Sequence, residues 1–143
     1  MMNLDNIDQS LLKKAESGDA TAQFELSMLL PLEHRQHISL LTSAAQQGHE
    51  QALLCMARYE QRQKNFEGTM KWLNQAKDLN VPRAYFLLAE IFKLGEDVPL
   101  DLEQSIEYYK QAADLGETDA SFELFKIYKD GKKKKKNKEI AEK

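Results

Sequence analysis

Apolar residues recur along this chain at spacings of three and four, which is the periodicity of one face of an α-helix. Four segments share the pattern, and each begins at an alanine: Ala22, Ala52, Ala84 and Ala120. Two residues after the alanine stands Phe or Leu, four residues after it Leu or Met, and seven residues after it Leu, Tyr or Ile. The pattern predicts four related helices, called A helices below.

Further helices are predicted between the A helices. These B helices cover about Leu32–Gln47, Phe66–Leu79 and Leu102–Leu115, and each carries an alanine four residues before its end signal. An initial helix over residues 6–17 places Leu4, Ile7, Leu11 and Ala15 on one face and resembles a B helix. The predicted order is B, AB, AB, AB, A.

The turns support this division. Gly48 and Gly116 follow B helices where a left-handed residue ends a helix, and Asn80 is the usual substitute for glycine there. Pro82 falls in the first turn of the next helix, where its missing N–H costs little. Because the unit repeats every 30 to 36 residues, the sequence predicts a helical solenoid.

The charge is distributed unevenly. The net charge is −3, but the segment 132–143 holds seven Lys and two Glu, so the rest of the chain is strongly acidic. The run Lys132–Lys136 is expected in an exposed turn of an incomplete last repeat, as part of a flexible, solvated tail. Binding of an anionic partner remains the alternative. Nucleic acid is an unlikely partner, because no aromatic residues interleave with the lysines and the body is acidic.

The third repeat resembles the Sel-1-like repeat, a relative of the tetratricopeptide repeat. The matching residues are Ala84, Leu88, Phe92, Gly95, Val98, Asp101, Ser105, Tyr108, Tyr109, Ala112, Ala113 and Gly116. The other repeats match more weakly, and the resemblance covers about residues 4–141. It implies an all-α, right-handed α-solenoid of antiparallel helix pairs, in proteins that are often bacterial adaptors or scaffolds.

We therefore expect one solenoid domain over residues 4–131, followed by the lysine-rich tail 132–143. Its repeats lie near 22–51, 52–83, 84–119 and, in part, 120–141. Trp72 and Tyr108 are expected in the core. The last repeat leaves an apolar edge that a second copy could cover. The chain is therefore expected to be a monomer or a weak homodimer.

No constellation of side chains indicates an enzyme, a cofactor or a metal site. His34 and His37 are spaced to share a helix face, but no third ligand follows in a recognisable pattern. His37 is expected to pack against a neighbouring helix, and His49 to be exposed. Cys55 is expected to be a half-buried apolar residue.

The compartment is expected to be the cytoplasm. A single cysteine excludes an internal disulfide and fits a reducing compartment. The N-terminus lacks the basic and apolar regions of a secretory signal. No apolar run approaches the ~20 residues that cross a bilayer, so no membrane span is expected.

The resemblance also suggests where a partner would bind. In tetratricopeptide-like stacks the A helices line a concave groove, which places eight candidate protein-binding residues there: Leu54, Arg58, Arg62, Arg83, Phe86, Glu90, Phe122 and Lys126. Arg58, Arg83 and Lys126 would hold an acidic peptide or a C-terminal carboxylate. Phe86 and Phe122 would be apolar anchors.

Three functions follow in order of preference. The first is a non-enzymatic adaptor or scaffold that binds another protein or a peptide, with no small-molecule substrate. The second is an inhibitor or immunity-type protein that occludes a toxin or an enzyme. An enzyme or a nucleic-acid binder is a distant third.

Overall fold

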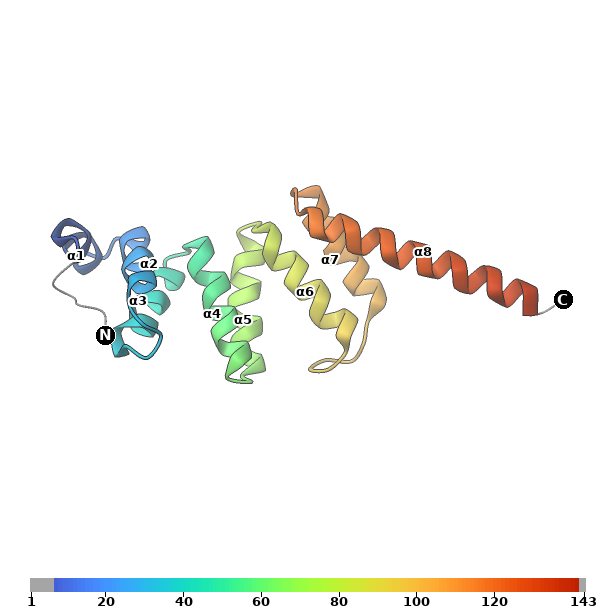
Figure 1. The fold of residues 1–143 in the computed structure, drawn as a ribbon, viewed down its shortest axis with the longest axis horizontal. Coiled ribbons are helices and arrows are strands. Elements are labelled where there is room, and N and C mark those ends of the chain that lie inside the picture. The colour runs from blue at the N-terminus through green and yellow to red at the C-terminus, as the bar shows by residue number, and fades with distance from the viewer. Residues whose placement is uncertain (1–6, 142–143) are drawn as a thin grey trace. The chain divides into compact units, whose positions relative to one another are not determined.

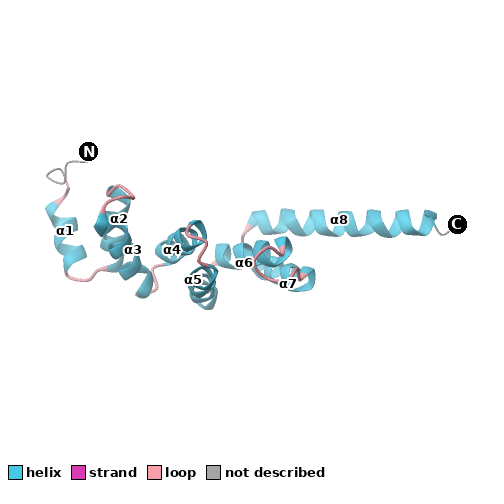
Figure 2. Ribbon diagram, turned by 90° about the horizontal axis from the view of Figure 1, so that it is seen from below, coloured by secondary structure: helices cyan, strands magenta, loops and turns pink. Residues whose placement is uncertain are grey.

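The computed structural model describes residues 7–141, and these residues form α-helices and no strands (Figure 1; Figure 2). The helices are α1 (Gln9–Glu16), α2 (Ala20–Leu29), α3 (Arg35–Gln46), α4 (Glu50–Arg62), α5 (Phe66–Asp78), α6 (Pro82–Leu94), α7 (Leu102–Asp114) and α8 (Thr118–Ala141). They form two compact units, which divide between Leu79 and Asn80. The predicted all-α repeat fold is confirmed, and the initial and B helices end within a few residues of the expected bounds.

Polar side chains start most of the helices. The Asp19 carboxylate accepts a hydrogen bond from the Ala22 backbone N–H at 2.8 Å. Asp101 does the same for Gln104 at 3.0 Å, and Asn65 for Gly68 at 3.2 Å. These caps satisfy N–H groups that have no partner inside the helix, so they fix where each helix begins.

The predicted left-handed residues are confirmed. Gly48, Asn80 and Gly116 have φ angles of 86°, 59° and 99°. The turn between α4 and α5 uses Lys64 in the same way, with a φ of 58°. This turn could not be predicted from the sequence, because a left-handed conformation is uncommon in residues other than glycine and asparagine.

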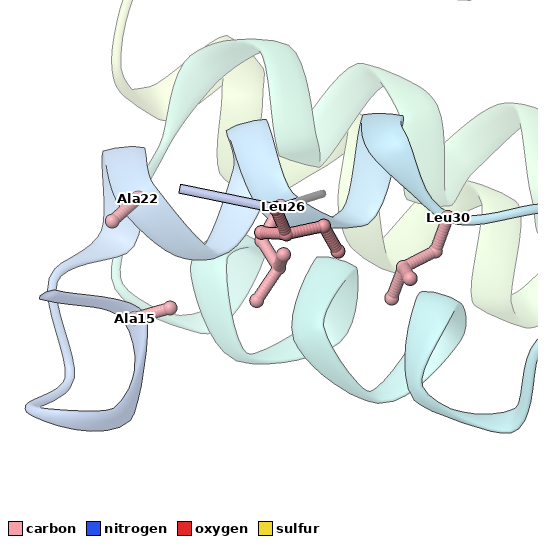
Figure 3. Packing of buried hydrophobic residues seen from close by; sticks show 5 residues of the cluster. Ala15, Ala22, Leu26 and Leu30 are labelled. Atoms are coloured by element: carbon pink, nitrogen blue, oxygen red, sulfur yellow. The ribbon is translucent and has the colours of Figure 1, made fainter. Parts of the chain in front are cut away.

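The first unit consists of residues 7–79. Its helices pack in chain order, α1 on α2, α2 on α3, α3 on α4 and α4 on α5. Its N-terminal core contains Ala15, Ala22, Leu26 and Leu30, all at most 5% exposed (Figure 3). The alanines let α1 and α2 approach closely. Leu29 was expected on the buried face, but it is 40% exposed, because α2 ends there and Leu30 turns into the core instead.

The second unit consists of residues 80–141. Helix α7 packs against both α6 and α8. The core between them contains Ala89, Tyr109, Ala112 and Ala120, which are fully buried. The expected burial of Trp72, in the first unit, is confirmed at 4% exposed. Tyr108 is only half-buried, with its ring 5.8 Å from that of Phe92.

Helix α8 corrects one expectation. The run Lys132–Lys136 does not form a turn, because a single helix continues through it from Thr118 to Ala141 (Figure 1). Lysine, glutamate and alanine are good helix formers, and Gly131 keeps an ordinary negative φ. Residues 128–141 are exposed, and this half of α8 runs past the end of α7.

The beginning of the predicted initial helix, including Leu4, lies outside the described residues. Within residues 7–141, no helix combines the length and the apolar character that a membrane crossing needs.

Candidate protein-binding site

The eight predicted binding residues are divided between the two units. Leu54, Arg58 and Arg62 lie on α4 in the first unit. The second unit holds the other five: Arg83, Phe86 and Glu90 on α6, and Phe122 and Lys126 on α8. The surroundings of these two groups differ in kind.

A pocket of about 150 Å³ opens in the first unit beside two of these residues. It is enclosed by α2, the turn after it, α3 and α4. Its lining is mainly apolar with two cations at the edge: Met28, Leu32, His37, Ile38, Leu41, Cys55, Arg58, Tyr59 and Arg62. Met28 and Leu32 are 47% and 53% exposed, so an apolar surface continues outward from the pocket.

Arg58 and Arg62 are one helical turn apart on α4, so their side chains share a face. Both residues are exposed, and neither forms an ion pair with a carboxylate within residues 7–141. Their guanidinium groups therefore keep their donors directed to solvent. Leu54 is half-buried and does not line the pocket.

Cys55 forms part of the pocket wall and is half-buried, as expected. Burial raises the pKa of its thiol, and the nearby charge of Arg58 opposes this only in part. The thiol is therefore neutral near pH 7 and contributes a polarisable, apolar surface rather than a nucleophile.

The three histidines have structural contacts. His37 is buried, with Nδ1 3.2 Å from the Leu30 carbonyl oxygen, so its expected packing role is confirmed. His34 and His49 cap helices, their Nδ1 atoms accepting from the N–H groups of Gln36 and Ala52. His49 was expected to be exposed but is half-buried, because its ring stacks on Phe24 with centroids 4.6 Å apart.

Possible metal ligands do not gather in this fold. Within residues 7–141, no group of three or more His, Cys, Asp or Glu side chains could hold a metal ion.

In the second unit the predicted cation Arg83 is held by the protein itself. Its Nη1 donates to Glu117 at 3.0 Å and to Asp119 at 2.9 Å. Its guanidinium carbon lies 4.3 Å from the centre of the Phe86 ring. The arginine thus fastens the start of α6 to the start of α8.

Lys126 is also paired. Its Nζ lies 2.7 Å from Glu123, and Lys93 of α6 reaches the other oxygen of the same carboxylate at 2.9 Å. The hydrogen bond from Lys126 is the main cause that lowers the pKa of Glu123, and Lys93 adds to it. Lys126 Nζ also lies 4.8 Å from the centre of the Phe122 ring, which is on a residue 60% exposed.

Glu90 accepts a hydrogen bond from the hydroxyl of Tyr109, a fully buried residue. Burial first, and then this hydrogen bond, raise the pKa of Tyr109 far above its usual range. The Phe86 ring lies 5.7 Å from the Tyr109 ring. Glu90 and Phe86 therefore help to hold α6 against α7.

Sequence reasoning missed Met28, Leu32 and Tyr59 as members of the pocket. Tyr59 was assigned to the core face of its helix. Met28 is an apolar residue outside the repeating apolar positions of its helix, and Leu32 follows Pro31 in a short turn. Met28 also stands six residues after Ala22, the repeat position that Arg58 occupies after Ala52, so this shared position was a signal that could have indicated the surface.

Residues 82–117 of this chain match the protein-family model described as Sel1 repeat. This is the third repeat, which carried the resemblance in the sequence. The chain contains a Sel1 repeat. Sel1 repeats generally act as protein–protein interaction modules, and proteins built from them are typically non-enzymatic.

Solved structures show the same fold. The chain is similar to a Sel1 repeat protein from Oxalobacter formigenes, with 26% identity and a TM-score of 0.78 over 86% of this chain. It also resembles a protective antigen with an SLR fold from uropathogenic Escherichia coli strains, with 24% identity and a TM-score of 0.71 over 84% of this chain. The matched region spans 53% and 28% of those two chains, respectively. No curated protein matches this chain.

Proposed function

We propose that this Sel1 repeat protein is a non-enzymatic adaptor or scaffold that binds a segment of a partner protein. The binding site is the pocket between α2, α3 and α4, with Arg58 and Arg62 at its edge. The segment presents an apolar side chain close to a carboxylate, which is either an acidic side chain or the C-terminus of the partner.

The observation that carries this proposal is the pairing of an apolar pocket with two arginines that have no carboxylate partner within residues 7–141. Arginine binds carboxylates with two parallel hydrogen bonds, which gives direction as well as strength. An apolar side chain in a desolvated pocket is the usual anchor of a protein interface. The two features together suit a short acidic and apolar motif.

The size of the pocket supports a peptide side chain over a cofactor. Its volume of about 150 Å³ is below the roughly 300–1,000 Å³ of typical small-molecule sites. The exposed Met28 and Leu32 beside it extend the apolar contact along a peptide.

The sequence predicted that Arg58, Arg83 and Lys126 would all bind a carboxylate of the partner, and we now propose this role for fewer of them. Arg83 and Lys126 each have carboxylate partners inside the second unit, so we assign carboxylate binding to Arg58 and Arg62. Leu54, on α4, is kept as a candidate secondary contact. Phe86, Glu90 and Phe122 belong to the second unit, and no part in this site is assigned to them.

A selection from a random peptide library with free C-termini tests this function and requires no identified partner. The full chain should enrich peptides that combine an apolar residue with Asp, Glu or a terminal carboxylate. The variant Arg58→Glu/Arg62→Glu should weaken binding of the selected peptides by about tenfold or more. The matched control Lys13→Glu/Lys110→Glu changes the charge equally at exposed sites on α1 and α7, two helices that do not line the pocket, and it should bind like the wild type.

Enriched peptides without acidic groups, or equal binding by both variants, would contradict the site. Once a protein partner is identified from the enriched motif, its own activity should be measured with and without this chain. Unchanged activity is expected of an adaptor, whereas loss of activity would identify the inhibitor that stands as the alternative.

A further inference from the structure

Helix α8 carries an aromatic surface that stays largely exposed within residues 7–141, although Lys126 reaches over one of its rings, Phe122. Phe122, Phe125 and Tyr128 are 60%, 62% and 50% exposed. In the earlier repeats the position of Phe125 is held by Ser27, Ala57 and Ala89, which are at most 3% exposed. This repeat position thus holds a small, buried residue in three repeats and a large, exposed residue in the fourth.

The charges on either side of this surface follow a definite order. Asp114 ends α7, Glu117 lies in the turn before α8, and Asp119 lies in the first turn of α8. Arg83 pairs with Glu117 and Asp119, so these three carboxylates and one arginine leave a net negative charge at this end. The exposed Lys132, Lys133 and Lys136 lie in its C-terminal half. The surface therefore runs from acidic through aromatic to basic.

We propose that two copies of this chain associate through α8, antiparallel, about a two-fold axis that passes near Phe125. With a rise of about 1.5 Å per residue, Thr118 and Lys132 lie at equal distances of about 10 Å on either side of Phe125. A two-fold rotation brings the basic half of each copy to the acidic end of the other. The three aromatic residues of each copy meet in the centre, as an isologous contact requires.

The order of charges favours a second copy over other occupants. An anionic lipid surface or a nucleic acid would attract the lysines but would repel the acidic end of the same face. A second copy matches both ends at once. The pairing also relieves the repulsion among lysines spaced three and four residues apart, in a half-helix that packs on nothing else within residues 7–141.

Sedimentation velocity of the full chain over a range of concentrations tests the proposal through a charge exchange. One variant is Lys132→Glu/Lys133→Glu/Lys136→Glu, and the other is Asp114→Lys/Asp119→Lys. Each variant alone brings like charges together at both ends, so its dimer dissociation constant should rise about tenfold or more. In an equimolar mixture both ends become complementary again, and a heterodimer should form with near wild-type affinity.

The wild-type dimer should weaken with added salt. A control variant, Lys13→Glu/Lys14→Glu/Arg35→Glu, carries three equivalent charge changes at exposed sites in the first unit and should dimerise normally. Far-ultraviolet circular dichroism should show unchanged helix content, because all the substituted side chains are exposed and Arg83 keeps its ion pair with Glu117 when Asp119 is replaced.

Three results would overturn the proposal. The first is a wild-type chain that stays monomeric at every concentration. The second is a mixture that associates no better than each variant alone. The third is a wild-type dimer whose dissociation constant Phe125→Asp leaves unchanged. A monomeric chain that binds phosphatidylserine vesicles or single-stranded DNA through the lysines would assign the surface to that partner instead.

Discussion

Arg58 and Arg62 stand beside a pocket in the first unit and make no ion pair within residues 7–141, whereas Arg83 and Lys126 in the second unit are bound to carboxylates of their own chain. The same position of the repeat, six residues after the alanine, illustrates the difference. It holds Met28, Arg58, Glu90 and Lys126. Arg58 lacks a partner among the described residues, Glu90 accepts from Tyr109, and Lys126 pairs with Glu123.

This difference teaches that a repeat position identifies a surface but not whether its charge is available to a ligand. Availability depends on the neighbouring helix, which the repeat pattern does not specify. In the second unit the polar side chains stabilise helix packing. In the first unit Arg58 and Arg62 remain open to a partner, whereas His37 and the helix caps are held within the unit. Substitutions in the second unit should therefore change stability, and those at the pocket should change binding.

The largest stability effect is expected at Tyr109. Tyr109→Phe removes a buried hydroxyl that donates to the Glu90 carboxylate, and should lower the free energy of unfolding by about 2 kcal/mol. The matched change in the first unit, Tyr59→Phe, removes a hydroxyl with no hydrogen bond in the described chain and should cost less than about 0.5 kcal/mol. Urea unfolding monitored by circular dichroism measures both, and equal losses would remove the distinction between the units.

A smaller effect is expected from the arginines. Arg83→Ala removes two ion pairs and the contact with Phe86, and should cost about 0.5–1 kcal/mol because the side chain is 41% exposed and screened by water. Arg58→Ala should change stability by less than about 0.5 kcal/mol. The Arg83 effect should shrink in 1 M NaCl, measured by the same unfolding experiment. A salt-independent loss would indicate that packing on Phe86, rather than charge, is responsible.

The smallest effect concerns pH. The pKa of Glu123 is lowered in the folded protein, first by the hydrogen bond from Lys126 and then by Lys93. Its contribution to stability is therefore present above the unfolded pKa of about 4.3 and is lost as the pH falls through the folded value. Glu123→Gln should reduce stability at pH 7 and make it less dependent on pH below about 4.5. Parallel curves for the two proteins between pH 3 and pH 6 would contradict this role.

The sequence predicted the fold closely because each level of the pattern agreed. Apolar spacing located the helices, and Gly48, Asn80 and Gly116 marked their ends with residues that adopt positive φ easily. Small residues at repeated positions indicated close helix packing, which Ala84, Ala89 and Ala112 confirm by being fully buried.

Other features could not be predicted from the pattern. Lys64 adopts a left-handed conformation because its neighbours require the turn, not because lysine favours it. The lysine run was expected in a turn because the repeat was extended by analogy, but helix propensity decided its structure. The pairing of Arg83 depends on the separation of α6 from the turn before α8, and the pocket depends on how Met28 and Leu32 approach α4. Such distances between elements are set by tertiary packing.

The central claim is that the partner binds in the pocket between α2, α3 and α4. NMR of the methionine methyl groups tests it most directly. Met28 lines the pocket, while Met70 lies on α5 in the same unit and does not line it, so the chain contains its own control. On titration with a selected acidic peptide, the Met28 methyl signal should shift to saturation and the Met70 signal should stay in place. In Arg58→Glu/Arg62→Glu the Met28 shift should require about tenfold more peptide, or more, to reach the same size. A peptide that binds tightly while Met28 does not move would contradict the assignment of this site.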